Sequence, residues 1–313
     1  MTDREGSVHA VSLPLTSGAT SVSSSVPNSV PTSTPSRAAA LAWARELIPS
    51  GEARALLRQQ LHCSTAHLLA WPERTLEAGQ WQAFVEQVQR RAAGEPLAYL
   101  LGECEFYGRL FAVTPAVLIP RHDTELLVEL ALERLPPHTP AQVLDLGCGS
   151  GVVAISLALE RPQAQVLALD ASRAALEVAQ ANALRLQAEL SFIHSDWFAQ
   201  LDRAHAEHRF ALIVSNPPYI AADDPHLSRG DLRFEPHSAL AAGERGLDDL
   251  QYIIAAAPAY LRPSGWLLLE HGHQQGAAVR DLLHAAGFSA VASWRDLAGH
   301  ERVSGGVRAT ELG

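Results

Sequence analysis

The stretch VLDLGCGSG, residues 143–151, reads as a buried strand that runs into a sharp glycine-rich turn. Asp145 lies near the end of the apolar run, and the segment VVAISLALE after Gly151 has the character of a helix. Glycines at 147, 149 and 151 let the backbone turn tightly and approach a ligand that a Cβ atom would push away. Their G-x-G-x-G spacing differs from the G-x-G-x-x-G pattern of dinucleotide phosphate sites. We therefore expect a strand, a ligand-approachable turn and a helix.

The chain repeats this strand-then-helix pattern from Gln142 onward. AQVLALD (164–170) and LSFIHSD (190–196) follow as strands, and FALIV (210–214) is a further apolar run. Alternation of this kind predicts an α/β fold with a mostly parallel sheet and helices on both of its faces. Ligands of such sheets bind at the carboxyl ends of the strands.

Composition limits the class of protein. The 313 residues are 47% hydrophobic, enough for a sizeable core and for two domains. A net charge of −10 argues against the broad basic surface that grips nucleic acid, so no stable nucleic-acid binding is expected. Three cysteines without metal-type spacing suit a reducing compartment, and no stretch approaches the ~20 apolar residues of a membrane span. We expect a cytoplasmic protein that does not bind membranes.

The chain divides into four segments by composition. Residues 1–36 are predicted to be a disordered tail, because 17 of the 26 residues from 11 to 36 are Ser, Thr or Pro. Residues 37–101 show apolar residues at helical spacing and predict a small helical bundle. Residues 102–120 resemble a β-hairpin linker, and 121–313 form the α/β domain, in which Thr124 or Asp123 is expected to cap the first helix.

Three successive strand ends carry groups that suit a nucleoside. The turn Gly147-Cys148-Gly149-Ser150-Gly151 permits close approach, and Asp170 can accept hydrogen bonds from both hydroxyls of a ribose. Asp170 has an alternative role as a helix N-cap, which Ser172 can equally fill. Trp197, beside Asp196, is placed to flank an adenine ring. Because no phosphate-binding G-x-x-x-x-G-K-[ST] motif is present, the pattern favours S-adenosylmethionine as cofactor.

The stretch SNPPYI (215–220) ends the fourth strand beside this site. Pro217 and Pro218 cannot extend a sheet and hold the chain in one shape. The Asn216 side-chain oxygen and the Pro217 carbonyl can accept the N–H bonds of a planar nitrogen, and Tyr219 can stack on the planar group. A turn that merely ends the strand is the structural alternative.

Taken together, these motifs resemble a known family. LDLGCGSG and SNPPY are similar to class I S-adenosylmethionine-dependent methyltransferases, which have a Rossmann-like seven-stranded sheet. Adding EFYG (105–108), LIPRHDTE (118–125), SDWF (195–198) and DLRFEP (231–236), the chain resembles the protein-(glutamine-N5) methyltransferases of peptide chain release factors, the PrmC/HemK family. The resemblance runs from about Ala39 to near the C-terminus.

The resemblance implies an activity and a set of site residues. The reaction is methyl transfer from S-adenosylmethionine to the side-chain nitrogen of the Gln in the Gly-Gly-Gln loop of release factors, a step that serves translation termination. By motif, the cofactor contacts fall on Gly147 to Gly151, Asp170, Trp197 and Asn216, and the substrate Gln is held by Asn216 to Tyr219. One position departs from the family, which usually has Pro where His122 stands.

Other readings remain. Glu270-His-Gly-His273 has a metal-like composition, but without further ligands we expect a strand end that faces solvent and no metal. An adenine-N6 nucleic-acid methyltransferase uses the same Asn-Pro-Pro-Tyr device, although it must also bind and unstack its substrate. A non-catalytic nucleoside-binding module is the third possibility, against which the intact Asn216 argues.

Overall fold

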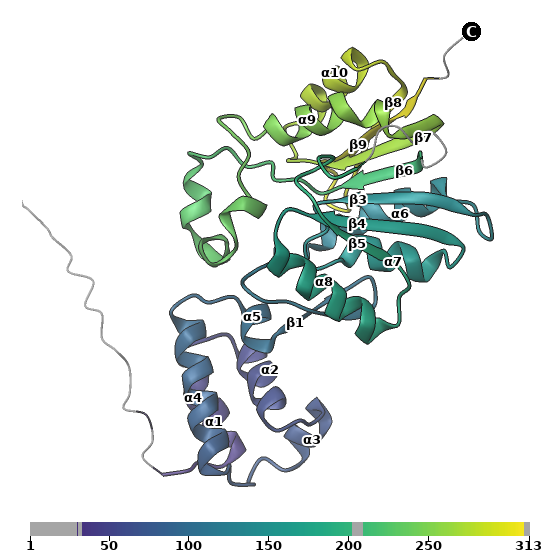
Figure 1. Ribbon diagram of the computed structural model, residues 1–313. Helices are drawn as coiled ribbons and strands as arrows, with labels where there is room; N and C mark the ends of the chain where they lie inside the picture. The colour runs from purple at the N-terminus through teal and green to yellow at the C-terminus, as the bar shows by residue number, and fades with distance from the viewer. Residues whose placement is uncertain (1–29, 31–32, 202–208, 310–313) are drawn as a thin grey trace, which may run out of the picture.

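A computed structural model describes residues 30, 33–201 and 209–309 of the chain. The expected tail therefore lies almost wholly outside the described residues. The first part of the described chain is helical, and the second part is an α/β sandwich (Figure 1). No helix in the described ranges is long and apolar enough to cross a membrane.

The helical part packs around a small core of its own. Trp43 meets Trp81 edge to face with ring centroids 5.2 Å apart, and Phe84 is fully buried beside them. The helices are α1 (Arg37–Ala44), α2 (Ser50–Gln60), α3 (Thr65–Ala70), α4 (Ala78–Ala92) and α5 (Leu97–Leu101). Gly102 ends α5 in a left-handed conformation, φ +72°. The chain then enters an antiparallel hairpin of β1 (Glu103–Phe106) and β2 (Arg109–Ala112), with Gly108 in its turn.

The described part of the chain holds one seven-stranded sheet in the order β5-β4-β3-β6-β7-β9-β8. The first five strands in this order are parallel, and β9 and β8 are antiparallel additions at one edge. The strands are β3 (Ala141–Leu146), β4 (Ala164–Asp170), β5 (Ser191–His194), β6 (Phe210–Ser215), β7 (Leu261–Glu270), β8 (Phe288–Arg295) and β9 (Glu301–Arg308). The predicted α/β class with a seven-stranded, mostly parallel sheet is confirmed.

Helices cover both faces of the sheet because successive strand residues point to opposite sides. On β6, Leu212 and Val214 pack with one set of helices, whereas Ile213 packs with the other. The first set contains α6 (Glu125–Arg134), α7 (Val152–Glu160) and α8 (Arg173–Leu186), and the second contains α9 (Asp248–Ala256) and α10 (Gly276–Ala285). Burial on both faces explains why the central strands are almost continuously apolar.

The strand order reverses between β3 and β6. From β3 the chain builds outward through β4 to β5, and it then returns to add β6 and β7 on the other side of β3. A crevice opens at the carboxyl ends of the strands where such a reversal occurs. The glycine-rich turn after β3 and the SNPPYI stretch after β6 therefore share one edge of the sheet (Figure 1).

Candidate active site

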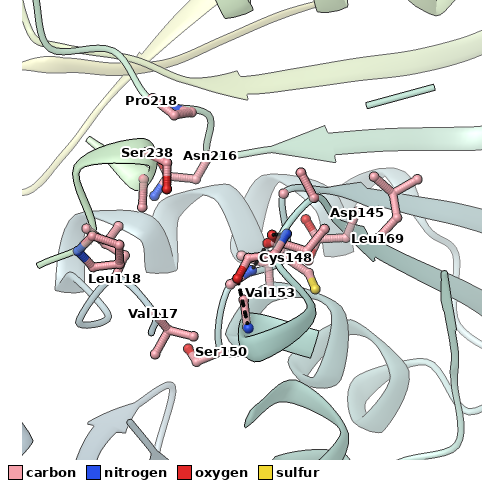
Figure 2. A pocket seen from close by; sticks show the side chains of 18 of the residues that line it. Val117, Leu118, Asp145, Cys148, Ser150, Val153, Leu169, Asn216, Pro218 and Ser238 are labelled. Atoms are coloured by element: carbon pink, nitrogen blue, oxygen red, sulfur yellow. Dashed lines mark hydrogen bonds between the residues drawn. The ribbon is translucent and has the colours of Figure 1, made fainter. Parts of the chain in front are cut away.

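A cavity of about 410 Å³ lies at this edge. Figure 2 shows side chains from the β3 turn, the β6 end and the segment before α6 converging on it. The predicted site residues among its lining are Gly147, Cys148, Gly149, Ser150, Asp170, Trp197, Asn216 and Pro218. Residues more than 60 positions apart in the chain are thus brought to one place.

The glycine turn is shaped by bonds to the neighbouring strand. The N–H groups of Gly147 and Cys148 both donate to the Leu169 carbonyl at 2.9 Å, which pulls the turn over the end of β4. Gly147, Gly149 and Gly151 all have positive φ. A Cβ atom on Gly147 would lie 3.4 Å from the Trp197 ring, so the turn and the indole are close neighbours, and the φ of +71° is what favours glycine here.

Asp170 is fixed by two backbone donors. Its Oδ2 accepts from Gly149 N at 2.9 Å and its Oδ1 from Ser172 N at 2.8 Å. Ser172 caps α8 through its own hydroxyl, which accepts from Ala175 N, so Asp170 does not serve as the helix cap. A carboxylate has about four lone-pair sites, so Asp170 retains acceptors for a ligand. Burial raises the pKa of Asp170, and the backbone donors oppose that rise.

Trp197 is held in an unusual conformation, with φ +43°. Asp249, at the start of α9, hydrogen-bonds the Trp197 side chain and also lines the cavity. The pKa of Asp249 is raised, mainly by burial. Since a left-handed conformation is costly for a large residue, the indole is oriented by its surroundings rather than by local preference.

Asn216 presents its amide through a contact with Thr124. The Asn216 Nδ2 donates to Thr124 Oγ1 at 3.3 Å, which leaves Oδ1 as the free acceptor of the amide. Thr124 occupies the N-cap position of α6, as expected, but its side chain makes no capping hydrogen bond, and α6 follows directly from a 3-10 turn at His122–Thr124. Thr124 is instead buried at the cavity.

Three predicted site residues lie just behind the lining. Gly151 begins α7, where a Cβ atom would stand 2.8 Å from Ile155 Cδ1 and 3.2 Å from the Ala179 Cβ, so it serves the packing of α7. Pro217 is buried beside Pro218. The Tyr219 hydroxyl donates to Glu270 Oε1 at 3.3 Å, and neither residue is part of the lining.

Asp145 is a functional candidate that sequence reasoning left unassigned. It lines the cavity, is almost fully buried, and accepts from Ala154 N at 3.0 Å. Burial raises the pKa of Asp145 to about 7, and the charge of Asp170 adds to this rise. The buried Cys148 thiol also has a raised pKa, so it stays protonated and is a poor nucleophile.

The segment before α6 contributes lining that sequence reasoning also missed. Val117, Leu118 and Arg121 face the cavity. Glu235, from the loop after SNPPYI, accepts from Ile119 N at 3.0 Å and pairs with Arg121. The motifs LIPRHDTE and DLRFEP carried a signal in the resemblance, but only the fold shows that they are bonded to each other.

Neither His122 nor the 270–273 stretch is part of the cavity lining. His122 is 82% exposed, and its Nδ1 lies 3.5 Å from Glu125 Oε1. The stretch does end a strand and His273 is exposed, but the expectation of a solvent-facing end is wrong for Glu270 and His271, which are fully buried where β9 pairs with β7. No group of three or more potential metal ligands occurs within residues 30, 33–201 and 209–309.

Comparisons with known proteins agree with this architecture. Residues 38–102 match the family model "PrmC N-terminal domain", and residues 123–229 match "Methyltransferase small domain". A release factor glutamine methyltransferase of Xylella fastidiosa is 50% identical over 86% of this chain and 96% of its own. One from Bordetella pertussis is 51% identical over 83% of this chain and 95% of its own.

A solved structure shares the fold at low identity. The hMettl16 catalytic domain, in complex with the MAT2A 3'UTR hairpin 6, has a TM-score of 0.50 and 14% identity over 77% of this chain and 87% of its own. The bacterial relatives are about 50% identical to this chain over nearly their whole length, and this similarity assigns the chain to their family. The chain belongs to the release factor glutamine methyltransferase family, and its cofactor is S-adenosylmethionine.

Proposed function

We propose that this chain transfers a methyl group to the side-chain amide nitrogen of the Gln in the Gly-Gly-Gln motif of peptide chain release factors. The observation that carries the proposal is the orientation of Asn216. Its Nδ2 is engaged by Thr124, and its Oδ1 remains as an acceptor at the cavity, one strand away from the glycine turn.

The residues after β6 act by orienting a poor nucleophile. An amide nitrogen has its lone pair delocalised, so it needs to be held in line for transfer. We assign Asn216 Oδ1 and the Pro217 carbonyl as acceptors for its two N–H bonds, which also favours the positive charge that develops there. Pro217 and Pro218 keep these acceptors preorganised. The Tyr219 ring is assigned to the planar face of the glutamine amide.

The residues after β3 and β4 fit the cofactor. Asp170 keeps acceptors for the ribose hydroxyls, and we assign the adenine to the part of the cavity lined by Asp196, Trp197 and Asp249. Gly149 and Ser150 line the turn without a bulky side chain. S-adenosylmethionine, when bound, supplies an electrophilic methyl group. The protein aligns that group with the glutamine nitrogen, which releases one N–H proton to solvent once the new N–C bond has formed.

The partner and the compartment are part of the same proposal. The partner is a release factor, and with a net charge of −10 we expect neither stable nucleic-acid binding nor attachment to membranes. Release factors act in the cytoplasm, and we place the chain there.

The test is incubation with labelled S-adenosylmethionine and three acceptors: a release factor, the same factor with its Gly-Gly-Gln changed to Gly-Gly-Ala, and duplex DNA. We expect label only in the first. Asn216→Ala should abolish transfer, whereas His122→Ala, at an exposed position next to Arg121 but outside the lining, should retain it. Label in DNA, or full activity of Asn216→Ala, would contradict the proposal.

A further inference from the structure

Glu270 is a fully buried carboxyl group directly behind the SNPPYI stretch. It ends β7, and β9 covers it through the pairing of Glu270 with Val303. Its Oε1 accepts from the Tyr219 hydroxyl at 3.3 Å. Its Oε2 is buried and has no hydrogen-bond partner among the described residues. A buried carboxyl group without full compensation costs stability, so its retention calls for a reason.

The nearby cation does not neutralise Glu270. Arg302 on β9 has its Nη2 3.1 Å from Asp123 Oδ2 and 3.2 Å from Asp296 Oδ2, and its charge reaches Glu270 only at longer range. The groups that face Glu270 are Thr124 and Asp123 from the turn before α6, Tyr219 from the loop after β6, and Arg302 from β9. Two of these, Thr124 and Tyr219, belong to or touch the proposed amide-binding set.

The contacts run in a line from the carboxyl group to the reacting position. The Thr124 hydroxyl favours the charged form of Glu270 on one side and accepts from Asn216 Nδ2 on the other. Tyr219 is also fixed at its backbone, where its carbonyl accepts from Gln275 Nε2 at 3.0 Å. At the hydroxyl end of the ring, the hydrogen bond to Glu270 is the corresponding restraint.

We propose that Glu270 is a positioning residue for methyl transfer, which acts through the Tyr219 hydroxyl to hold the Tyr219 ring in the orientation that binds the substrate amide. Glu270 does not touch the substrate. The inference rests on the proposed function, since it assumes that Asn216 and Tyr219 hold the substrate glutamine.

Glu270→Gln keeps the size of the side chain and an acceptor for Tyr219 but removes the charge. We expect kcat to fall about 10-fold, with KM for the release factor and Kd for S-adenosylmethionine within twofold of the wild type. In a Tyr219→Phe background, the same substitution should change kcat by less than twofold, because the contact through which Glu270 acts is already gone. Independent, multiplicative effects of the two substitutions would overturn the proposal.

The pH profile is a second measurement. Burial raises the pKa of Glu270 to about 7, and the hydrogen bonds from Tyr219 and Thr124 oppose this rise. The Tyr219 hydroxyl donates more strongly to a carboxylate than to a neutral acid. Wild-type kcat should therefore rise through pH 7, and both Glu270→Gln and Tyr219→Phe should lose that inflection. An unchanged inflection in Tyr219→Phe overturns the proposal even if Glu270→Gln does not fold.

The control is Glu301→Gln on β9, which removes a carboxylate that pairs with Arg280 of α10 at 2.9 Å rather than with Tyr219. We expect its kcat to be unchanged, and an equal loss there would overturn the assignment to Glu270. A wild type without activity on release factors would contradict the proposed function, whereas an active wild type with an active, pH-dependent Glu270→Gln would contradict only this inference.

Discussion

At the residue scale, the site depends on carboxyl groups held by backbone donors. Asp170 is bonded to Gly149 N and Ser172 N, and Asp145 is bonded to Ala154 N. These bonds fix the direction of each carboxyl group before any ligand arrives, which reduces the ordering that binding requires. The two side chains nevertheless differ in burial, and the difference leads to separate predictions.

Asp170→Ala should weaken S-adenosylmethionine binding by roughly 1.5 to 3 kcal/mol, the range for losing a charged hydrogen-bond partner. Calorimetric titration measures this directly. The matched control is Ser64→Ala, which removes the side-chain cap of α3 in the helical part and should lower stability by about 1 kcal/mol without changing the affinity. Equal affinities in Asp170→Ala and the wild type would remove Asp170 from the cofactor site.

Asp145 should make stability depend on pH. Its folded-state pKa is about 7, above the unfolded value near 3.9, so the folded chain binds the proton more tightly. The stability associated with this proton is present below about pH 4 and is lost as pH rises to about 7. Asp145→Asn should therefore gain on the order of 3 to 4 kcal/mol relative to the wild type between pH 4 and pH 8. Urea denaturation at both pH values tests this, and parallel pH profiles would contradict it.

At the element scale, two nearby glycines in the turn between β3 and α7 have different roles: one gives access to the cavity and the other allows the helices to pack. Gly149 has φ +54° and open space where its Cβ would lie, on the cavity side. Gly151 has φ +83° and tight contacts with α7 and α8. The same residue type is thus needed for ligand access at one position and for helix packing at the other.

Gly151→Ala should lower the free energy of unfolding by about 1 to 3 kcal/mol, because it adds both backbone strain and overpacking against Ile155. Gly149→Ala should cost less stability and should weaken cofactor binding more. Denaturation and titration of both variants give the two quantities. The assignment would fail if the variants lost stability and affinity in the same order.

Local sequence patterns were sufficient to predict the site residues that stand at the end of a strand. The glycines, Asp170 and Asn216 follow apolar strands directly, so parallel packing was enough to bring them to one edge. The contact of the Thr124 hydroxyl with Asn216 and the burial of Glu270 were not predicted, because both depend on segments that are distant in the chain. Glu270 is covered only because β9 returns antiparallel beside β7, and the Ile119–Glu235 bond joins residues 116 positions apart. No periodicity within a short window carries such information.

At the scale of the whole molecule, the helical part and the α/β part meet at the loop after SNPPYI. Arg233 donates to the Ala93 carbonyl, and Arg91 lies 3.5 Å from Asp231. The same loop reaches the cavity through Pro236, Ser238 and Ala239. The loop that contacts the helical part therefore also forms one wall of the cavity.

Arg233→Ala should raise KM for the release factor by about two- to fivefold, in line with an exposed polar contact of up to about 1 kcal/mol, and should leave the cofactor Kd unchanged. Arg58→Ala is the control, because its guanidinium bonds the Cys63 carbonyl within the helical part. Steady-state kinetics of both variants with the release factor as substrate measure the two KM values. An altered cofactor Kd with an unaltered KM would show that the loop serves the cofactor instead.

The reversal of strand order between β3 and β6 has a consequence for how such a protein can change over generations. The groups assigned to the methyl donor come from one side of the reversal, and those assigned to the methyl acceptor come mostly from the other. Sequence drift on the acceptor side can therefore redirect the chemistry to a different planar nitrogen while donor recognition is inherited intact. The order of the strands thus separates the residues assigned to acceptor recognition, which can change, from those assigned to donor recognition, which are retained.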